Sequence, residues 1–229
     1  MAQLFEFPQH DQTVDALVDA ISQNVASCLA KNNACSLAVA GGNTPKPLFK
    51  KLSHTPLPWD RIKITLTDER WVSRKHDESN EKMLKECLLT GLAEKAHFVS
   101  MKNKEATPEA GQSLCELTLQ KSISPLNIVV LGMGEDGHFA SIFPGMENTE
   151  RLLNSYQPRL CLAANPEGKP PRMSLTLSYL KSADQVYLLI TGDAKKHIIE
   201  QALENKLAAD QYPICTLLNE TDLHIYWNA

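Results

Sequence analysis

The most constraining feature of the sequence is a buried-strand pattern that runs directly into a glycine-rich loop. Residues 127–131 form a short, apolar, largely β-branched run, which is typical of a strand buried on both faces of a parallel sheet. Gly132, Gly134 and Gly137 follow, and the loop then reaches His138. Ligands in α/β folds bind where loops leave the carboxyl ends of parallel strands. We therefore expect the chemistry of this protein at this loop.

The same three glycines match G-x-G-x-x-G, the fingerprint of a dinucleotide-binding site. That fingerprint requires the glycines to open a long helix and an acidic residue to close the next strand. Here Pro144 and Gly145 follow closely, and the next acidic residues, Glu147 and Glu150, have no strand before them. The context therefore argues against a nicotinamide site.

Length, charge and cysteine spacing limit the class of protein. The 229 residues can bury a substantial core, and no linker, repeat or low-complexity segment divides them, so we expect one domain over residues 1–229. The net charge of -4 favours neither nucleic acid nor an anionic membrane as a partner. The cysteines lack metal-ligand spacing, and neither a signal peptide nor a membrane-spanning run is present. These features indicate the reducing cytoplasm.

Helical and strand patterns alternate along the chain. This alternation predicts a doubly wound, Rossmann-like α/β fold, in which helices flank both faces of a mostly parallel sheet. Residues 145–157 are expected to form a surface excursion or a short helix, and the last strand is expected at a sheet edge. Helices are predicted at residues 13–30, 45–52, 80–89, 107–121 and 193–203, and further strands at residues 34–40, 62–66, 97–101, 160–164, 186–190 and 223–227.

A second glycine loop follows the strand of residues 34–40. Gly41, Gly42, Asn43 and Thr44 precede a predicted helix, for which Thr44 followed by Pro45 is a good N-cap and first-turn pair. A glycine turn that leads into a capped helix offers free backbone N–H groups to an oxyanion such as phosphate. The alternative is a plain tight turn, and spacing alone favours phosphate only slightly.

Charged residues occur at three other positions that we expect at the same rim. Asp68, Glu69 and Arg70 follow a core strand, where Asp68 is suited to position or accept protons and Arg70 to clamp an anion. The alternative is a solvated strand end with an internal ion pair. Arg172 follows a proline-rich loop, and Lys195 lies in the first turn of a helix, where a cation is unfavourable unless an anion is bound. An ordinary exposed basic residue is the alternative for Arg172.

Backbone amides, arginine and lysine make a phosphate cradle, and a nearby histidine makes a general acid or base. The sequence has no G-x-S-x-G nucleophile elbow and no Gly-Lys-Ser/Thr phosphate loop, which argues against a serine hydrolase and a nucleoside triphosphatase. These residues by themselves predict an enzyme or a binding protein for a small phosphorylated metabolite.

In combination, the motifs resemble the 6-phosphogluconolactonase family, within the glucosamine/galactosamine-6-phosphate isomerase superfamily. The resemblance implies a cytoplasmic enzyme, without metal or cofactor, that hydrolyses 6-phosphoglucono-1,5-lactone to 6-phosphogluconate in the pentose phosphate pathway. Two positions depart from the pattern, Ala40 where serine is frequent and Ser174 where threonine is usual. The missing hydroxyl at Ala40 bears on phosphate affinity more than on activity. The matching segments are residues 41–45, Trp59, 67–72, 79–80, 132–144 and 171–174.

The residues and the resemblance together fit a water-mediated mechanism. Neutral His138 would remove a proton from the water that attacks the lactone carbonyl. Either Asp136 or Asp68 would hold the imidazole or the water, and the sequence does not choose between them. Amides of residues 132–137 or the guanidinium of Arg70 would stabilise the oxyanion. Phosphate is expected to be bound by the Gly41–Gly42 loop, Thr44, Arg172 and Lys195.

Two alternatives share the expected fold. Glucosamine-6-phosphate deaminases carry a glutamate five residues after the motif histidine, where this chain has Phe143, and Asp-Glu-Tyr in place of Asp68-Glu69-Arg70. A ring-opening deaminase needs that extra carboxylate, so its absence favours the lactonase. A sugar-phosphate sensor of a transcriptional regulator would need a helix-turn-helix segment and a basic face, and we expect neither here. We expect a monomer or a weak homo-oligomer whose partner is a sugar phosphate.

Overall fold

The computed structural model describes residues 2–229 and is built around a parallel seven-stranded sheet. Every neighbouring pair of strands in this sheet is parallel, which confirms the predicted doubly wound α/β fold. The strands lie in the order β1 (Gln3–Phe7), β10 (Leu223–Asn228), β9 (Gln185–Thr191), β6 (Ile128–Leu131), β2 (Cys35–Val39), β3 (Ile62–Leu66) and β5 (His97–Phe98).

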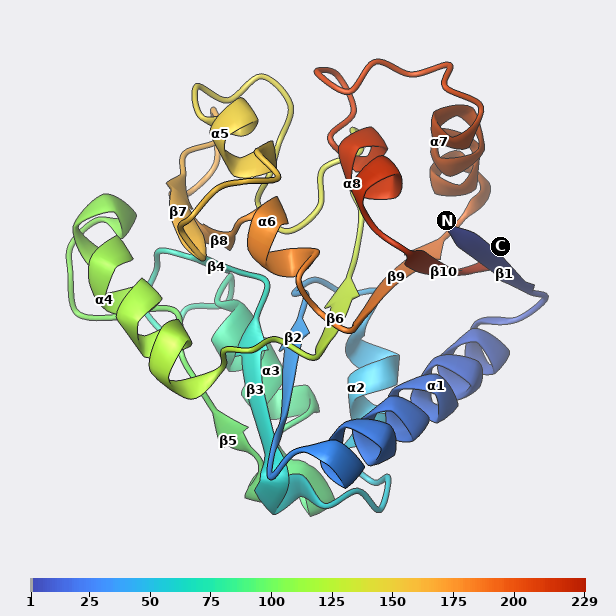
Figure 1. Ribbon diagram of the computed structural model, residues 1–229, viewed down its shortest axis with the longest axis vertical. Helices are drawn as coiled ribbons and strands as arrows, with labels where there is room; N and C mark the ends of the chain where they lie inside the picture. Colours follow the sequence, from blue (N-terminus) through green and yellow to red (C-terminus); the bar gives the residue numbers. More distant parts are fainter. Residues whose placement is uncertain (1) are drawn as a thin grey trace.

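Helices cover both faces of this sheet. Figure 1 shows α6 and α8 in front of the strands and α2 and α3 behind them, and α1 packs beside α2. All residues of the central strands β2 and β6 are consequently buried. The helices are α1 (His10–Lys31), α2 (Lys46–Leu52), α3 (Asn80–Cys87), α4 (Pro108–Ser122), α5 (Thr149–Leu153), α6 (Leu177–Leu180), α7 (Asp193–Leu203) and α8 (Ile214–Glu220). Short 3-10 turns occupy Trp59–Arg61 and Gly91–Lys95.

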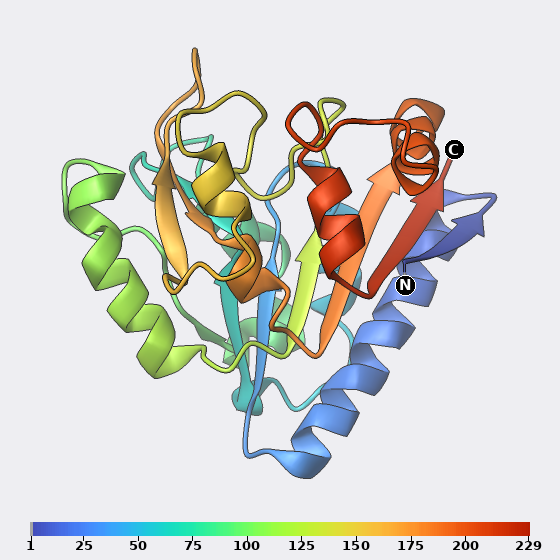
Figure 2. The same cartoon turned by 45° about the horizontal axis from the view of Figure 1, so that its top comes forward.

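A small antiparallel sheet stands above the carboxyl ends of the parallel strands. Its order is β4 (Asp68–Arg70), β8 (Arg172–Leu175) and β7 (Cys161–Ala164). In Figure 2, with the top of the molecule turned forward, this sheet lies beside α4, against which β7 packs. The register places Asp68 opposite Ser174 and Arg70 opposite Arg172. The expectation that residues 68–70 simply end a core strand was therefore incomplete, because they form a strand of a second sheet.

Two local predictions were wrong, and short elements were missed. The last strand, β10, is not at the sheet edge, because β1 pairs along its outer side. Neither β1 nor α8 was predicted, since their runs are too short for a clear period. Thr44 does not cap α2: the helix begins at Lys46 with Pro45 as N-cap, and no side chain bonds to its first turn. Ser79 and Thr107 are the N-caps of α3 and α4, since their hydroxyls accept the amide N–H groups of Lys82 and Ala110.

Candidate active site

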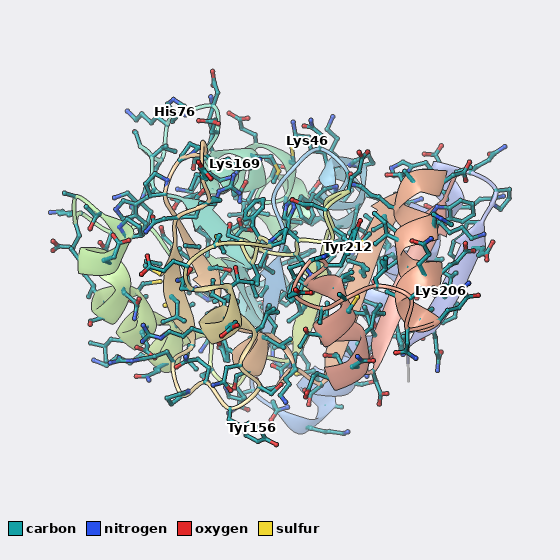
Figure 3. The ribbon with its side chains drawn as sticks, turned by 90° about the horizontal axis from the view of Figure 1, so that it is seen from above. Lys46, His76, Tyr156, Lys169, Lys206 and Tyr212 are labelled. Atoms are coloured by element: carbon teal, nitrogen blue, oxygen red, sulfur yellow. The ribbon has the colours of Figure 1, made fainter. Side chains whose placement is uncertain are left out.

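A cavity of about 210 Å³ opens at the carboxyl ends of the central strands. All the residues predicted at this rim line it, except Asp136 and Glu69. The glycine loop follows β2, His138 lies in the loop after β6, and Lys195 lies in the first turn of α7, which follows β9; the small sheet supplies Asp68, Arg70 and Arg172. This convergence is the consequence of parallel strands, whose carboxyl ends share one edge. Seen from above in Figure 3, Tyr212 lies toward the middle of this face, and His76 and Tyr156 lie at its outer edge.

His138 is fixed on two sides. Its Nδ1 lies 2.5 Å from Oδ1 of Asp136, and its ring stacks on Phe143 with centroids 4.0 Å apart and planes 23° apart. A proton on Nδ1, donated to the carboxylate, leaves Nε2 as a hydrogen-bond acceptor. Nothing in residues 2–229 bonds to Nε2. The arrangement therefore presents a histidine base whose orientation is set before a ligand arrives.

Asp136 is the carboxylate that holds the histidine. Burial raises the pKa of Asp136, but the hydrogen bond and the charge of His138, with backbone N–H donors, outweigh it and hold that pKa below its ordinary value. Asp136 is therefore ionised near neutral pH and accepts the Nδ1 proton of His138. The sequence left the choice between Asp136 and Asp68 open, and the structure brings Asp136 to the imidazole.

Asp68 lies in a different network on the other side of the cavity. It is 5% exposed, and its Oδ2 accepts the Ser141 hydroxyl at 2.5 Å. Nη1 of Arg172 lies 3.8 Å from the same oxygen and 3.4 Å from the Ser141 Oγ. Thr67 donates its hydroxyl to Oδ1 at 3.3 Å. Asp68 is thus a buried, paired carboxylate beside the cavity, and it makes no contact with His138.

The glycines of the loop after β6 make room for the histidine. A Cβ on Gly134 would lie 2.2 Å from Cε1 and Nδ1 of His138, and Gly137 has a φ of +72°. The amide N–H of Gly134 donates to the His138 carbonyl, and that of Gly137 donates to the Gly134 carbonyl. Because these amides already have acceptors, they are not free to stabilise an oxyanion.

The arginines beside the cavity have unsatisfied donors. Arg172 is 9% exposed, and neither its Nε nor that of Arg70 has a partner within the described chain. Burial lowers the pKa of Arg172, partly offset by Asp68, although a guanidinium stays charged at physiological pH. Buried unsatisfied donors are costly, and an anion in the cavity would satisfy them.

The loop after β2 offers further donors. The amide N–H groups of Gly41, Gly42, Asn43 and Thr44 have no acceptor anywhere in residues 2–229. Gly42 has a φ of +95°, which glycine tolerates. Four free amides that line one cavity make a cradle for an oxyanion. Lys195 lines the same cavity from α7, and no carboxylate of the described chain pairs with it.

Glu69 does not face the cavity, contrary to expectation. Its carboxylate accepts the amide N–H groups of Arg70, Asn80 and Glu81 at 2.7 to 2.8 Å, and the Ser79 hydroxyl at 3.1 Å. Burial raises the pKa of Glu69 despite these donors. Glu69 therefore ties β4 to the start of α3, and the alternative of a solvated strand end is excluded for it.

Sequence reasoning missed four residues that shape the site. Ser141 and Phe143 lie in the matching segment of residues 132–144. The contact of Ser141 with Asp68 and that of Phe143 with His138 depend on the fold. Lys169, from the proline-rich loop, lies 5.3 Å above the Phe143 ring, and Asn80 lines the cavity. Within the described residues, no cluster of three or more metal-ligating side chains is present, and no helix is long and apolar enough to cross a membrane.

Comparison with known proteins defines the family. Residues 8–227 match the family model described as glucosamine-6-phosphate isomerases/6-phosphogluconolactonase. The chain belongs to this family. A 6-phosphogluconolactonase of Rhizobium meliloti is 37% identical over 98% of this chain and 97% of its own length. One of Pseudomonas putida is 36% identical over 88% of this chain and 82% of its own.

Solved structures of the family have the same fold. The crystal structure of a 6-phosphogluconolactonase from Shewanella baltica has a TM-score of 0.94 and 33% identity, and covers 100% of this chain and 98% of that one. A monomeric glucosamine-6-phosphate deaminase has a TM-score of 0.81 at 15% identity, which shows the common fold alone. The family fold thus accommodates both chemistries, and the side chains of the site have to distinguish them.

The two departures from the family pattern have different consequences. Oγ of Ser174 is fully buried and accepts the Ser141 amide N–H at 3.1 Å, so serine keeps the hydroxyl that this position uses. Ala40 lines the cavity, and its N–H bonds to the Val130 carbonyl. The backbone donors of the glycine loop are retained there, and only a side-chain hydroxyl is missing.

We predict that Glu69→Ala lowers the free energy of unfolding by at least about 3 kcal/mol. The substitution leaves three N–H groups without acceptors, those of Asn80 and Glu81 buried and that of Arg70 part-buried, each at a cost of roughly 1 kcal/mol or more. Urea denaturation measures the loss. Glu86→Ala, an exposed change in α3, is the control and should change stability by less than about 0.5 kcal/mol. Equal stabilities of the two variants would contradict the assigned role of Glu69.

Proposed function

We propose that this site hydrolyses 6-phospho-D-glucono-1,5-lactone to 6-phospho-D-gluconate with water activated by His138. The observation that carries the proposal is the pairing of His138 Nδ1 with Asp136 beside a cavity rich in unsatisfied anion donors. Membership of the family and similarity to named 6-phosphogluconolactonases support it. Phe143 occupies the position where a deaminase carries its additional carboxylate, which favours lactone hydrolysis over deamination.

The proton movements follow from the geometry of His138. Nε2 accepts a proton from water as the water oxygen attacks C1 of the lactone, and Asp136 stabilises the imidazolium that forms. When the tetrahedral intermediate collapses, the bond from C1 to the ring oxygen breaks and the imidazolium protonates that oxygen. The product acid then ionises. A lactone is an activated ester, so we infer no covalent intermediate.

The oxyanion requires donors that are still free. Because the Gly134 and Gly137 amides are engaged within the loop, we assign the oxyanion to the guanidinium groups of Arg70 and Arg172, which line the cavity and have an unpaired Nε each. Asp68, held by Ser141 and close to Arg172, is suited to accept a hydrogen bond from water or from a sugar hydroxyl. We assign Asp68 to orientation of these groups and Asp136 to the histidine.

The phosphate is assigned to the glycine loop and α7. The free amides of Gly41, Gly42, Asn43 and Thr44 supply hydrogen bonds, and Lys195 supplies charge. A lysine in the first turn of α7 opposes the helix dipole, and a bound dianion removes that penalty. Binding the phosphate far from C1 orients the ring for attack.

The same proposal includes the setting of the reaction. We infer a single catalytic domain over residues 1–229, acting in the cytoplasm without metal or cofactor. The proposed partner is the sugar phosphate itself, with no nucleic acid or membrane, and the proposed state is a monomer or a weak homo-oligomer. The net charge of -4 and the six free cysteines are consistent with this setting.

The decisive experiment is proton release from freshly made 6-phosphogluconolactone. Wild type should accelerate hydrolysis above the spontaneous rate, and His138→Ala should lower kcat by roughly 10²- to 10⁴-fold with little change in KM. His97→Ala, on the exposed edge strand β5, is the matched control. Unchanged turnover in His138→Ala would remove this residue from the mechanism, and ammonia release from glucosamine 6-phosphate would instead indicate a deaminase.

Gly134→Ala should also lower turnover without unfolding the protein. The added Cβ would meet the His138 ring at 2.2 Å, and this half-buried ring can move aside only by leaving Asp136. We expect kcat to fall by at least about 10²-fold, the lower end of a general base's contribution. The thermal midpoint should change little. Full activity in Gly134→Ala would show that the ring position does not matter.

Lys195→Ala should raise KM more than it lowers kcat, because the phosphate lies away from the reacting carbon. Loss of one ionic hydrogen bond predicts an increase in KM of roughly tenfold. Steady-state kinetics at low salt measure the change, and Lys206→Ala removes an equal charge from an exposed lysine that does not line the cavity as a control. Equal kinetics in both variants would exclude Lys195 from phosphate binding.

A further inference from the structure

Asn80 lies where the glycine loop, β4 and α3 meet. It is the first residue of α3, is 3% exposed, and lines the active-site cavity. None of the roles derived so far uses its side chain. A buried polar side chain at such a junction has to be explained by the groups it contacts.

The Asn80 amide fills the space beside Gly41. A Cβ built on Gly41 would lie 2.0 Å from Oδ1, 2.2 Å from Cγ and 2.5 Å from Nδ2 of Asn80. The φ of Gly41 is outside the left-handed region, so its backbone conformation does not require glycine. Glycine is needed at this position because the Asn80 side chain occupies the place of a Cβ.

The same side chain is hydrogen-bonded to β4, the strand of Asp68 and Arg70. Nδ2 of Asn80 donates to the Asp68 carbonyl at 2.9 Å. The Asn80 backbone N–H donates at 2.8 Å to Oε1 of Glu69, and the same oxygen accepts the Arg70 N–H at 2.8 Å. Asn80 is therefore hydrogen-bonded to the strand that carries Asp68 and Arg70, and its side-chain amide packs against the glycine loop.

We propose that Asn80 is a positioning residue that sets the separation between the phosphate-binding loop and the strand of Asp68 and Arg70. The proposal rests on the proposed function, because that function assigns the substrate phosphate to the glycine loop. When the phosphate is bound in the glycine loop, the separation between that loop and the strand of Asp68 and Arg70 decides where the sugar ring lies relative to these two side chains. A displacement of about 1 Å at a positioning residue can cost roughly 10²-fold in rate.

A purely structural role in starting α3 is the competing explanation. That role already belongs to Ser79, whose hydroxyl accepts the Lys82 N–H as the N-cap, and to Glu69, which binds the first amides. The side-chain amide of Asn80 satisfies no group of the helix. Its contacts lie instead with Asp68 and Gly41, on the side of the cavity.

A double-mutant cycle tests the proposal with wild type, Gly41→Ala, Asn80→Ala and the double variant. Gly41→Ala should raise KM and weaken binding of inorganic phosphate by at least about tenfold, because the Cβ forces the loop away from Asn80. Asn80→Ala should raise KM by a smaller factor. Adding Gly41→Ala to Asn80→Ala should change either quantity by less than about threefold, since the space is then empty.

Steady-state kinetics give KM and kcat, calorimetry gives phosphate affinity, and thermal midpoints report the fold. Additive losses in the double variant, or a lowered midpoint for Asn80→Ala with unchanged KM and phosphate affinity, would overturn the proposal. If the wild type hydrolyses no lactone, the proposed function fails by itself. The phosphate affinities of the same four proteins would then still decide whether Asn80 positions the loop.

Discussion

Burial of the central parallel strands on both faces is the constraint on which the rest of the structure depends. Strands β2 and β6 expose no residue, so neither can carry a functional side chain on a solvated face. Polar functional groups can therefore lie only in the loops that follow these strands, and the carboxyl ends of parallel strands lie at one edge of the sheet. The glycine loop and the loop of His138 are therefore neighbours across the cavity, although they are far apart in the sequence.

The small antiparallel sheet adds what the parallel sheet lacks. Its register brings Arg70 opposite Arg172, and Asp68 opposite Ser174, above the strand ends. Two guanidinium groups on neighbouring strands repel each other unless carboxylates or a bound anion compensate. Asp68 lies near Arg172, but the buried Nε of each arginine remains without a partner in the described chain. The small sheet thus places two cationic side chains at the cavity, and an anionic ligand would satisfy their unpaired donors.

The three carboxylates at or beside the site have roles that follow from their neighbours. Asp136 accepts from an imidazole and stays ionised, Asp68 is enclosed by a hydroxyl and a guanidinium, and Glu69 collects the amides at the start of α3. All three are acidic residues next to the site in sequence or space. Their different partners explain why only Asp136 is placed to orient the imidazole of His138.

The sequence by itself determined the fold class, most of the longer helices and strands, and most of the glycine and charged residues that line the cavity. These depend on periodicity, capping and glycine placement, which act over a few residues. Only the tertiary structure decided that Asp136 rather than Asp68 holds His138, that Glu69 turns away, and that β1 covers β10. It also decided that the Asn80 side chain packs against Gly41, in the place that a Cβ would take. Most of these contacts join residues separated by ten to more than two hundred positions in the sequence. Even between near neighbours, no local sequence pattern indicates which carboxylate will contact which partner in the folded chain.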